Sequence, residues 1–178
     1  MIPAELRAAI KENNLVLFVG AGLSCKFENK NGVEIGNWKN LVIKIIDHLE
    51  NNEPKVKNLQ PLAEDYSPID MLNLIEKTGN AVRNKALEFA VDFFTLPDDK
   101  NDYSLHKKLS QLTKKIVTTN YDNSFEIAEN NFRTRTTSLG DKFGFQYLHK
   151  PDEFTLLKLH GSITSADKMV AFQWATSC

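Results

Sequence analysis

Three short segments of the chain carry groups that could do chemistry: GAGLS at 20–24, TTNYD at 118–122 and HGS at 160–162. Glycines that follow a strand let the main chain approach a phosphate, whose charge then meets backbone N–H groups. Asparagine and aspartate supply an amide and a carboxylate, and histidine is the side chain best suited to exchange a proton near neutral pH. Each segment directly follows an apolar run, which is where a strand would end.

The first segment, with Gly20, Ala21, Gly22 and Ser24, has a phosphate-binding interpretation and a purely structural one. A tight turn after a strand explains the glycines equally well. The segment is not a P-loop, because no Gly-Lys-Ser/Thr sequence follows it. It also lacks the second strand of a dehydrogenase fingerprint, which ends in an acidic residue about 20 positions on. The corresponding stretch here, residues 38–50, has helical spacing instead.

Asn120 and Asp122, in the second segment, also allow two interpretations. The structural one is a helix N-cap, for which both residue types are favoured, and taken alone it is the stronger of the two. The functional one is an amide and a carboxylate that project from a strand end into a cleft. Asp122 could serve both purposes.

His160 ends an apolar strand and is followed by a glycine, which leaves room beside its ring. A lone histidine is more often structural than catalytic, but this setting favours a general base. The other histidines lack such a setting. His48 and His106 fall on predicted helices, and His149 precedes Lys-Pro in a predicted turn.

Two rival chemistries find little support in the sequence. A Ser-His-Asp hydrolase would use Ser24, but GAGLS is not the Gly-x-Ser-x-Gly nucleophile elbow. A metal site built on Asp122 and His160 lacks supporting ligand spacing, so we expect no metal.

The elements that must position these groups follow from hydrophobic patterning. Apolar runs predict strands over 15–19, 116–119 and 154–159, the first of them buried on both faces. Helical spacing predicts helices over 3–13, 38–50 and 123–130, and in pieces over 55–113, where Ser104 is expected to cap the last piece. Residues 25–36 are predicted to form a loop, and weaker patterns suggest short strands over 133–137 and 144–148.

Strands that alternate with helices predict an α/β fold, namely a Rossmann-like parallel sheet with a helical insertion over about 52–113. Ligands of such sheets bind outside the carboxyl ends of the strands. All three chemical segments lie at that position. This convergence is the most informative feature of the sequence.

Composition limits the function classes. A length of 178 residues suits one domain. The net charge of −1 gives no overall positive field that would attract nucleic acid or an anionic membrane. No apolar run approaches the ~18 residues of a membrane span. The polar N-terminus does not resemble a signal peptide. Two cysteines, Cys25 and Cys178, cannot form a four-cysteine zinc site and suggest the reducing cytoplasm.

The three segments, extended to VGAGLS at 19–24, TTNYD at 118–122 and LKLHGS at 157–162, resemble motifs of the sirtuin superfamily in the same order. IGNW at 35–38 and LHKKLSQL at 105–112 are similar to parts of the sirtuin-like domains of bacterial antiphage defence proteins. The resemblance covers about residues 10–172. It implies a single sirtuin-like domain over 1–178.

The chain departs from protein-deacylating sirtuins in two places. It cannot form their four-cysteine zinc module, and CKFENKNGVEIGNW at 25–38 stands where they carry Gly-Ile-Pro-Asp-Phe-Arg. The zinc-free, helix-inserted branch resembles enzymes that cleave NAD. The family also continues past His-Gly-Ser into strands that hold the adenosine half of NAD, whereas here at most one short strand, Met169–Phe172, precedes Cys178. We therefore expect a truncated C-terminal part, with an adenosine site that is incomplete or completed by another chain.

The resemblance implies an NAD+ glycohydrolase that releases nicotinamide and ADP-ribose or a cyclic product, as an antiphage defence effector. It implies catalytic roles for Asn120 and for His160, the latter as general base. NAD, as substrate, would contact Gly20, Ala21, Gly22, Ser24, Asn120 and Asp122. Two alternatives stay open: a module that binds NAD or ADP-ribose without turnover, and an enzyme of protein ADP-ribosyl transfer or deacylation. A homo-oligomer or a partner chain of a defence system also stays open.

Overall fold

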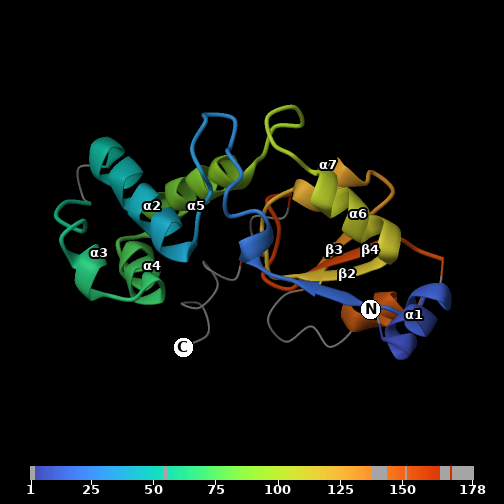
Figure 1. The fold of residues 1–178 in the computed structure, drawn as a ribbon. Coiled ribbons are helices and arrows are strands. Elements are labelled where there is room, and N and C mark those ends of the chain that lie inside the picture. Colours follow the sequence, from blue (N-terminus) through green and yellow to red (C-terminus); the bar gives the residue numbers. More distant parts are fainter. Residues whose placement is uncertain (1–2, 54–55, 138–143, 151, 165–168, 170–178) are drawn as a thin grey trace.

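A computed structural model describes residues 3–53, 56–137, 144–150, 152–164 and 169, and Figure 1 shows its two-part architecture. One part is a four-stranded sheet in the order β1-β2-β4-β3, in which every neighbouring pair is parallel. The strands are β1 Leu17–Val19, β2 Lys115–Thr118, β3 Arg133–Thr136 and β4 Thr155–Lys158. The predicted α/β class with a parallel sheet is confirmed. All four carboxyl ends therefore lie at one edge of the sheet.

The two central strands of the sheet, β2 and β4, are fully buried. Every residue of β2 and β4 is buried, with Ile116 and Leu156 inaccessible to solvent. β1 differs, since β2 is its one partner among the described strands, and Phe18 is 67% exposed. The prediction that the run 15–19 is buried on both faces is therefore wrong. An apolar run fixes a strand but not its place in the sheet order, and the described part of the chain covers only one side of β1.

The second part is a layer of four helices beside the sheet (Figure 1). These are α2 Trp38–Asn52, α3 Leu62–Asp65, α4 Pro68–Lys77 and α5 Asn80–Phe94. Asn37 caps α2 by accepting a hydrogen bond from the N–H of Asn40, and Ser67 caps α4 in the same way through Asp70. The apolar stripes of these helices form the larger core, with Leu41, Ile45, Ile46, Leu49, Met71, Leu72, Ile75, Ala86 and Ala90 almost fully buried.

The remaining helices belong to the sheet. α6 Ser104–Leu112 follows the helical layer and leads into β2, α7 Ser124–Ala128 connects β2 to β3, and the two pack against each other (Figure 1). The helical layer thus runs over 38–94 rather than over about 52–113. α1 Ala4–Lys11 precedes β1, and all of its side chains are at least partly exposed.

Two local predictions differ from the structure, and a third lies mostly outside the described residues. Ser104 is the first residue of α6, and the carboxylate of Asp102 accepts a hydrogen bond from its N–H at 2.9 Å. The segment predicted as a strand over 144–148 is a 3₁₀ helix, η2 Gly144–His149, because β3 and β4 already pair directly and leave no strand position between them. Of the expected strand Met169–Phe172 only Met169 is described, buried in the larger core, and the rest lies outside the described residues.

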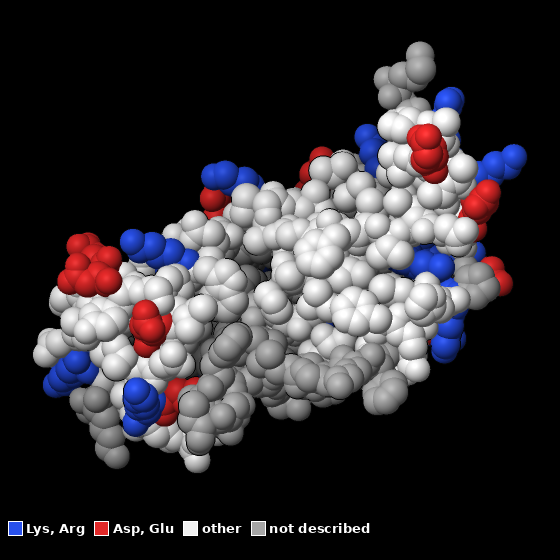
Figure 2. Space-filling model, turned by 90° about the horizontal axis from the view of Figure 1, so that it is seen from below, with Lys and Arg blue, Asp and Glu red and all other residues white. Residues whose placement is uncertain are grey.

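The described surface has no dominant charge. On the face drawn in Figure 2, charged side chains of both signs lie mainly toward the two ends of the molecule, and the described residues between them are mostly uncharged. None of the described helices combines the length and the apolar character needed to cross a bilayer.

Candidate active site

The three chemical segments meet in one cavity of about 150 Å³ at the carboxyl ends of the strands. The 3₁₀ turn after β1 contributes Ala21 and Ser24, the end of β2 contributes Asn120 and Asp122, and the end of β4 contributes His160. The other lining residues are Ile35, Gly36, Asn37, Trp38, Phe94, Thr119 and Tyr121. The site therefore lies where the sheet meets the helical layer.

Ser24 joins the first two segments through hydrogen bonds that are shielded from water. Its hydroxyl donates to Oδ2 of Asp122 at 2.8 Å and accepts from Nδ2 of Asn120 at 3.2 Å. Ser24 is 1% exposed and Asp122 is 4% exposed. Buried networks of this kind fix their members in one geometry when the hydrogen bonds are made. Serine thus sets the relative positions of the amide and the carboxylate.

Asp122 combines the two functions that the sequence left open. While Oδ2 accepts from Ser24, Oδ1 accepts from the N–H of Ser124 at 3.0 Å, at the first turn of α7. The carboxylate therefore satisfies a free N–H at a helix start and still lines the cavity.

Asn120 offers an unused acceptor. Its N–H donates to Oγ1 of Thr118 at 3.0 Å, and its Nδ2 also donates to the carbonyl of Gly20 at 3.3 Å. Its Oδ1 is buried and has no hydrogen-bond partner among the described residues. Leaving a buried acceptor unsatisfied costs about 1–3 kcal/mol. A ligand hydroxyl or amide N–H in the cavity would remove that cost.

His160 lies in the cavity wall, with its ring centroid 6.4 Å from that of Tyr121. Burial lowers the pKa of His160 below its usual 6.5. The imidazole is therefore neutral near pH 7 and able to accept a proton. Gly161, which follows it, has a φ of 96°, a backbone conformation that strongly favours glycine at this turn.

Comparison with known proteins agrees with this geometry. A model of the SIR2-like domain matches residues 114–173, the segment that carries Asn120, Asp122 and His160. Over these residues the chain is similar to a SIR2-like domain. It is also similar to NAD(+) hydrolase ThsA of Cytobacillus dafuensis, at 27% identity over 167 residues. That match covers 93% of this chain and 30% of the relative, so the chain spans less than a third of the length of the curated protein it matches.

Gly20 and Gly22 lie beside the cavity but are not among the residues that line it. Gly20 has an extended backbone, with φ −115°, and a Cβ atom at either position would meet no described atom within 4 Å. The space next to both Cα atoms is open. Contact between these two glycines and a ligand stays a prediction, and the open space beside them is consistent with it.

Sequence reasoning missed the aromatic wall of the cavity. The ring of Tyr121 packs edge-on against Trp38 at 5.8 Å between centroids, and Phe94 lies 5.5 Å from the same ring. Trp38 and Phe94 come from α2 and α5, and the sequence favoured a place in the core for both, with an oligomer surface as the alternative. A signal was present in Gly36 and Asn37, a left-handed glycine followed by an N-cap that turns the chain into α2 at the cavity.

Within the described part of the chain, no group of three or more His, Cys, Asp or Glu side chains could hold a metal ion. Asp122 and His160 both line the cavity, but no third such side chain joins them among its lining residues.

Proposed function

We propose that this sirtuin-like domain is an NAD+ glycohydrolase, which breaks the bond between nicotinamide and ribose. The observation that carries the proposal is the gathering of Ser24, Asn120, Asp122 and His160 around one cavity at the strand ends. The similarity to a protein named NAD(+) hydrolase supports the choice of substrate.

The size of the cavity suits one end of the substrate. Pockets for drug-sized ligands are typically about 300–1,000 Å³, so a cavity of about 150 Å³ would take nicotinamide and part of its ribose. The rest of the dinucleotide would lie along the strand ends. The open space beside Gly20 and Gly22, next to Ala21, suits the pyrophosphate, since phosphates favour backbone N–H groups that they can approach closely.

The carboxylate and the amide would prepare the bond for cleavage. Nicotinamide leaves as a neutral molecule from a cationic ring, so positive charge develops on the ribose. Asp122 would bind the carboxamide and fix the ring for departure, and its negative charge would stabilise the transition state. Oδ1 of Asn120 would accept a hydrogen bond from a ribose hydroxyl or from the attacking water.

His160 would act as the general base. Water attacks C1 of the ribose, the C–N bond breaks with its electron pair going to nicotinamide, and Nδ1 or Nε2 of His160 takes the proton of the water. The products are nicotinamide, ADP-ribose and one proton. A hydroxyl or ring nitrogen of the substrate that attacks in place of water would give a cyclic product.

Nicotinamide release from NAD+ by the purified chain tests the proposal. We expect His160→Ala to lower kcat by about 10²–10⁴-fold, the usual contribution of a positioned base, and Asn120→Ala to abolish turnover. His149→Ala and Asn84→Ala are matched controls, because both residues are exposed and lie outside the cavity. Wild-type rates in a folded His160→Ala variant would contradict the role of His160.

A binding module is the second candidate, and the length of the relative favours it. The chain spans 30% of the length of the protein named NAD(+) hydrolase ThsA. Calorimetry with NAD+ and with ADP-ribose, combined with the nicotinamide-release assay, distinguishes a binding module from a glycohydrolase. Binding without nicotinamide release by the folded chain would favour the module.

We also propose that the domain serves in antiphage defence by depleting NAD+. This rests on the resemblance of IGNW at 35–38 and LHKKLSQL at 105–112 to such proteins. Bacteria that express the chain should survive phage challenge better and lose cellular NAD+ on infection, and Asn120→Ala should remove both effects. Equal survival with the wild type and the variant would contradict the proposal.

A further inference from the structure

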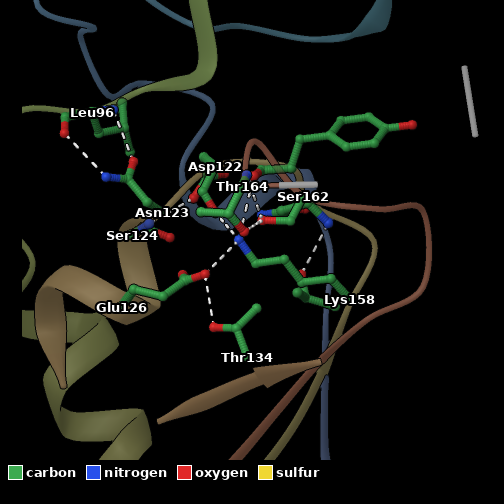
Figure 3. Close-up of polar contacts among 12 residues, drawn as sticks. Leu96, Asp122, Asn123, Ser124, Glu126, Thr134, Lys158, Ser162 and Thr164 are labelled. Carbon is green, nitrogen blue, oxygen red and sulfur yellow. Dashed lines mark hydrogen bonds and ion pairs between the residues drawn. The ribbon is translucent and has the colours of Figure 1, made fainter. Parts of the chain in front are cut away.

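Lys158 is an almost completely buried ammonium that the proposed chemistry does not use. It is the last residue of β4, two positions before His160, and its side chain is 1% exposed. Burying a charge costs several kcal/mol unless the charge is paired and its donors are satisfied. Here the partners of all three N–H donors are visible (Figure 3).

Two of those partners are main-chain carbonyls of the candidate active site. Nζ donates to the carbonyl of Tyr121 at 3.3 Å and to that of Asp122 (Figure 3). The third partner is Oε1 of Glu126 in α7, at 2.8 Å, which also accepts a hydrogen bond from Thr134 at 3.0 Å. The ammonium thus holds the two peptide groups that flank the Cα of Asp122.

These carbonyls need an anchor because the ladder of the sheet ends before them. The last register pair of β2 and β4 is Thr118 with Lys158, and one further bond runs from the N–H of Leu159 to Thr118 at 2.9 Å. Beyond that point the chain of β2 turns into the cavity. A hydrogen bond from a charged donor is roughly twice as strong as one between neutral groups.

The opposite side of the same loop is fixed by Asn123. Its Oδ1 accepts from the N–H of Leu96 at 2.8 Å, and its Nδ2 donates to the carbonyl of Leu96 at 3.3 Å. Asn123 therefore ties the loop to the segment after α5, and Lys158 ties it to the sheet (Figure 3). Lys158 links the loop of Asn120 and Asp122 to the end of β4, and the N–H of Ile163, beyond His160, also donates to the carbonyl of Tyr121 at 3.4 Å.

We propose that Lys158 is a positioning residue that sets the geometry of Asp122 and Asn120 relative to His160. The inference rests on the proposed NAD+ cleavage. Lys158 is not among the residues that line the cavity, and it acts through the carbonyls of Tyr121 and Asp122. Because misplacement by about 1 Å can cost 10²-fold in rate, loss of the anchor should lower kcat far more than it changes KM.

Lys158→Met and Glu126→Gln form the test pair. Methionine keeps much of the volume but no donor, so we expect kcat to fall by about 30-fold or more with KM changed less than about 3-fold. Glutamine keeps an oxygen that accepts from Lys158 and leaves both carbonyl bonds, so its kcat should stay within about 3-fold of wild type. Ile75→Ala, in the buried face of α4, is a control for lost stability without contact to the site. Equal loss of kcat in Ile75→Ala at a matched melting temperature would overturn the proposal.

The double variant Lys158→Met/Glu126→Met guards against misfolding. Replacing both members of a buried ion pair with apolar side chains is often neutral for stability, so this protein should fold. It still lacks the donor, and its kcat should be as low as that of Lys158→Met. Recovery of wild-type kcat in the double variant would overturn the positioning role.

Amide hydrogen exchange separates this inference from the proposed function. Lys158→Met should speed exchange by about tenfold or more in the peptide over 119–124 and leave α4 unchanged, whether or not the protein cleaves NAD+. Absence of nicotinamide release by the wild type would refute the proposed function alone. Unchanged exchange over 119–124 in a folded Lys158→Met variant would refute the positioning role alone.

Discussion

At the scale of single residues, His160 joins a reactive group to an environment that keeps it neutral. Burial lowers its pKa below 6.5, so the base form persists to a lower pH than in a free histidine. We predict that kcat/KM for NAD+ is flat through pH 6.5 and falls only at lower pH, by tenfold per unit. A pH profile between 5 and 8 tests this, and a limb that begins above pH 7 would contradict it.

A second histidine, His106, affects stability instead. It is 1% exposed among Phe27, Tyr103 and Phe125, and neither ring nitrogen has a hydrogen-bond partner in the described residues. Burial lowers its pKa below 6.5, against a smaller opposing effect of the Asp122 carboxylate. The unfolded chain therefore binds a proton below pH 6.5 that the folded chain does not, and stability falls as pH falls through that value.

We predict that His106→Phe removes this acid sensitivity. One such group contributes at most about 1.4 kcal/mol per pH unit to the slope of the unfolding free energy. Phenylalanine should also be neutral or stabilising at pH 7, because two unpartnered polar atoms leave the core. Urea unfolding at pH 5 and 7 measures both effects, with the exposed His149→Phe as control. If the unfolding free energy of His106→Phe changed with pH as steeply as that of the wild type, His106 would not be the source of the acid sensitivity.

At the scale of elements, the entry into α2 shapes one wall of the cavity. Gly36 has a φ of 60°, and a Cβ atom there would overlap the side chain of Asn40. The turn places Asn37 to cap α2 and brings Trp38 to the ring of Tyr121. Glycine is required here for both backbone conformation and space.

Gly36→Ala should therefore weaken both stability and turnover. We expect a loss of about 1–2 kcal/mol from the left-handed backbone conformation, which corresponds to about 2–8 °C in Tm for a chain of this size. Turnover of NAD+ should fall further than for Gly79→Ala, a change at another glycine with positive φ that is remote from the cavity. Scanning calorimetry with the release assay tests this. Equal turnover in the two variants would show that the α2 entry does not shape the site.

At the scale of the whole molecule, the cavity is shared between the sheet and the helical layer. Asn120, Asp122 and His160 come from strand ends, whereas Trp38 and Phe94 come from α2 and α5. A ligand that fills the cavity would contact both parts at once. It should therefore stabilise the fold as one unit.

We predict that NAD+ raises the Tm of the His160→Ala variant, which should bind NAD+ without consuming it. At 100 times Kd the gain is about 2.7 kcal/mol, or roughly 5–10 °C for a chain of this length. Nicotinamide alone should give the same shift at the same multiple of its own Kd, because the gain depends only on the ratio of ligand concentration to Kd. A thermal scan measures this, and no shift at millimolar NAD+ would refute binding.

Local patterns in the sequence determined the elements and the chemistry at their ends. The runs of Ile116 and Leu156 predicted two strands, and helical spacing predicted α2, α4 and α5, because burial on one face or both leaves a periodic signature. Parallel strands also place their carboxyl ends together, so Asn120, Asp122 and His160 could be assigned to one site before their positions were known.

The tertiary structure decided which distant groups meet. Ser24 and Asp122 are 98 positions apart, and no local rule predicts their hydrogen bond. The same holds for Trp38 and Phe94 in the cavity wall, for Phe18 on an edge strand, and for Lys158 beneath the loop of Asp122. Periodicity in the sequence predicts which face of a helix or strand is buried. Strand order and helix packing decide which other element covers that face, and both depend on contacts between distant parts of the chain.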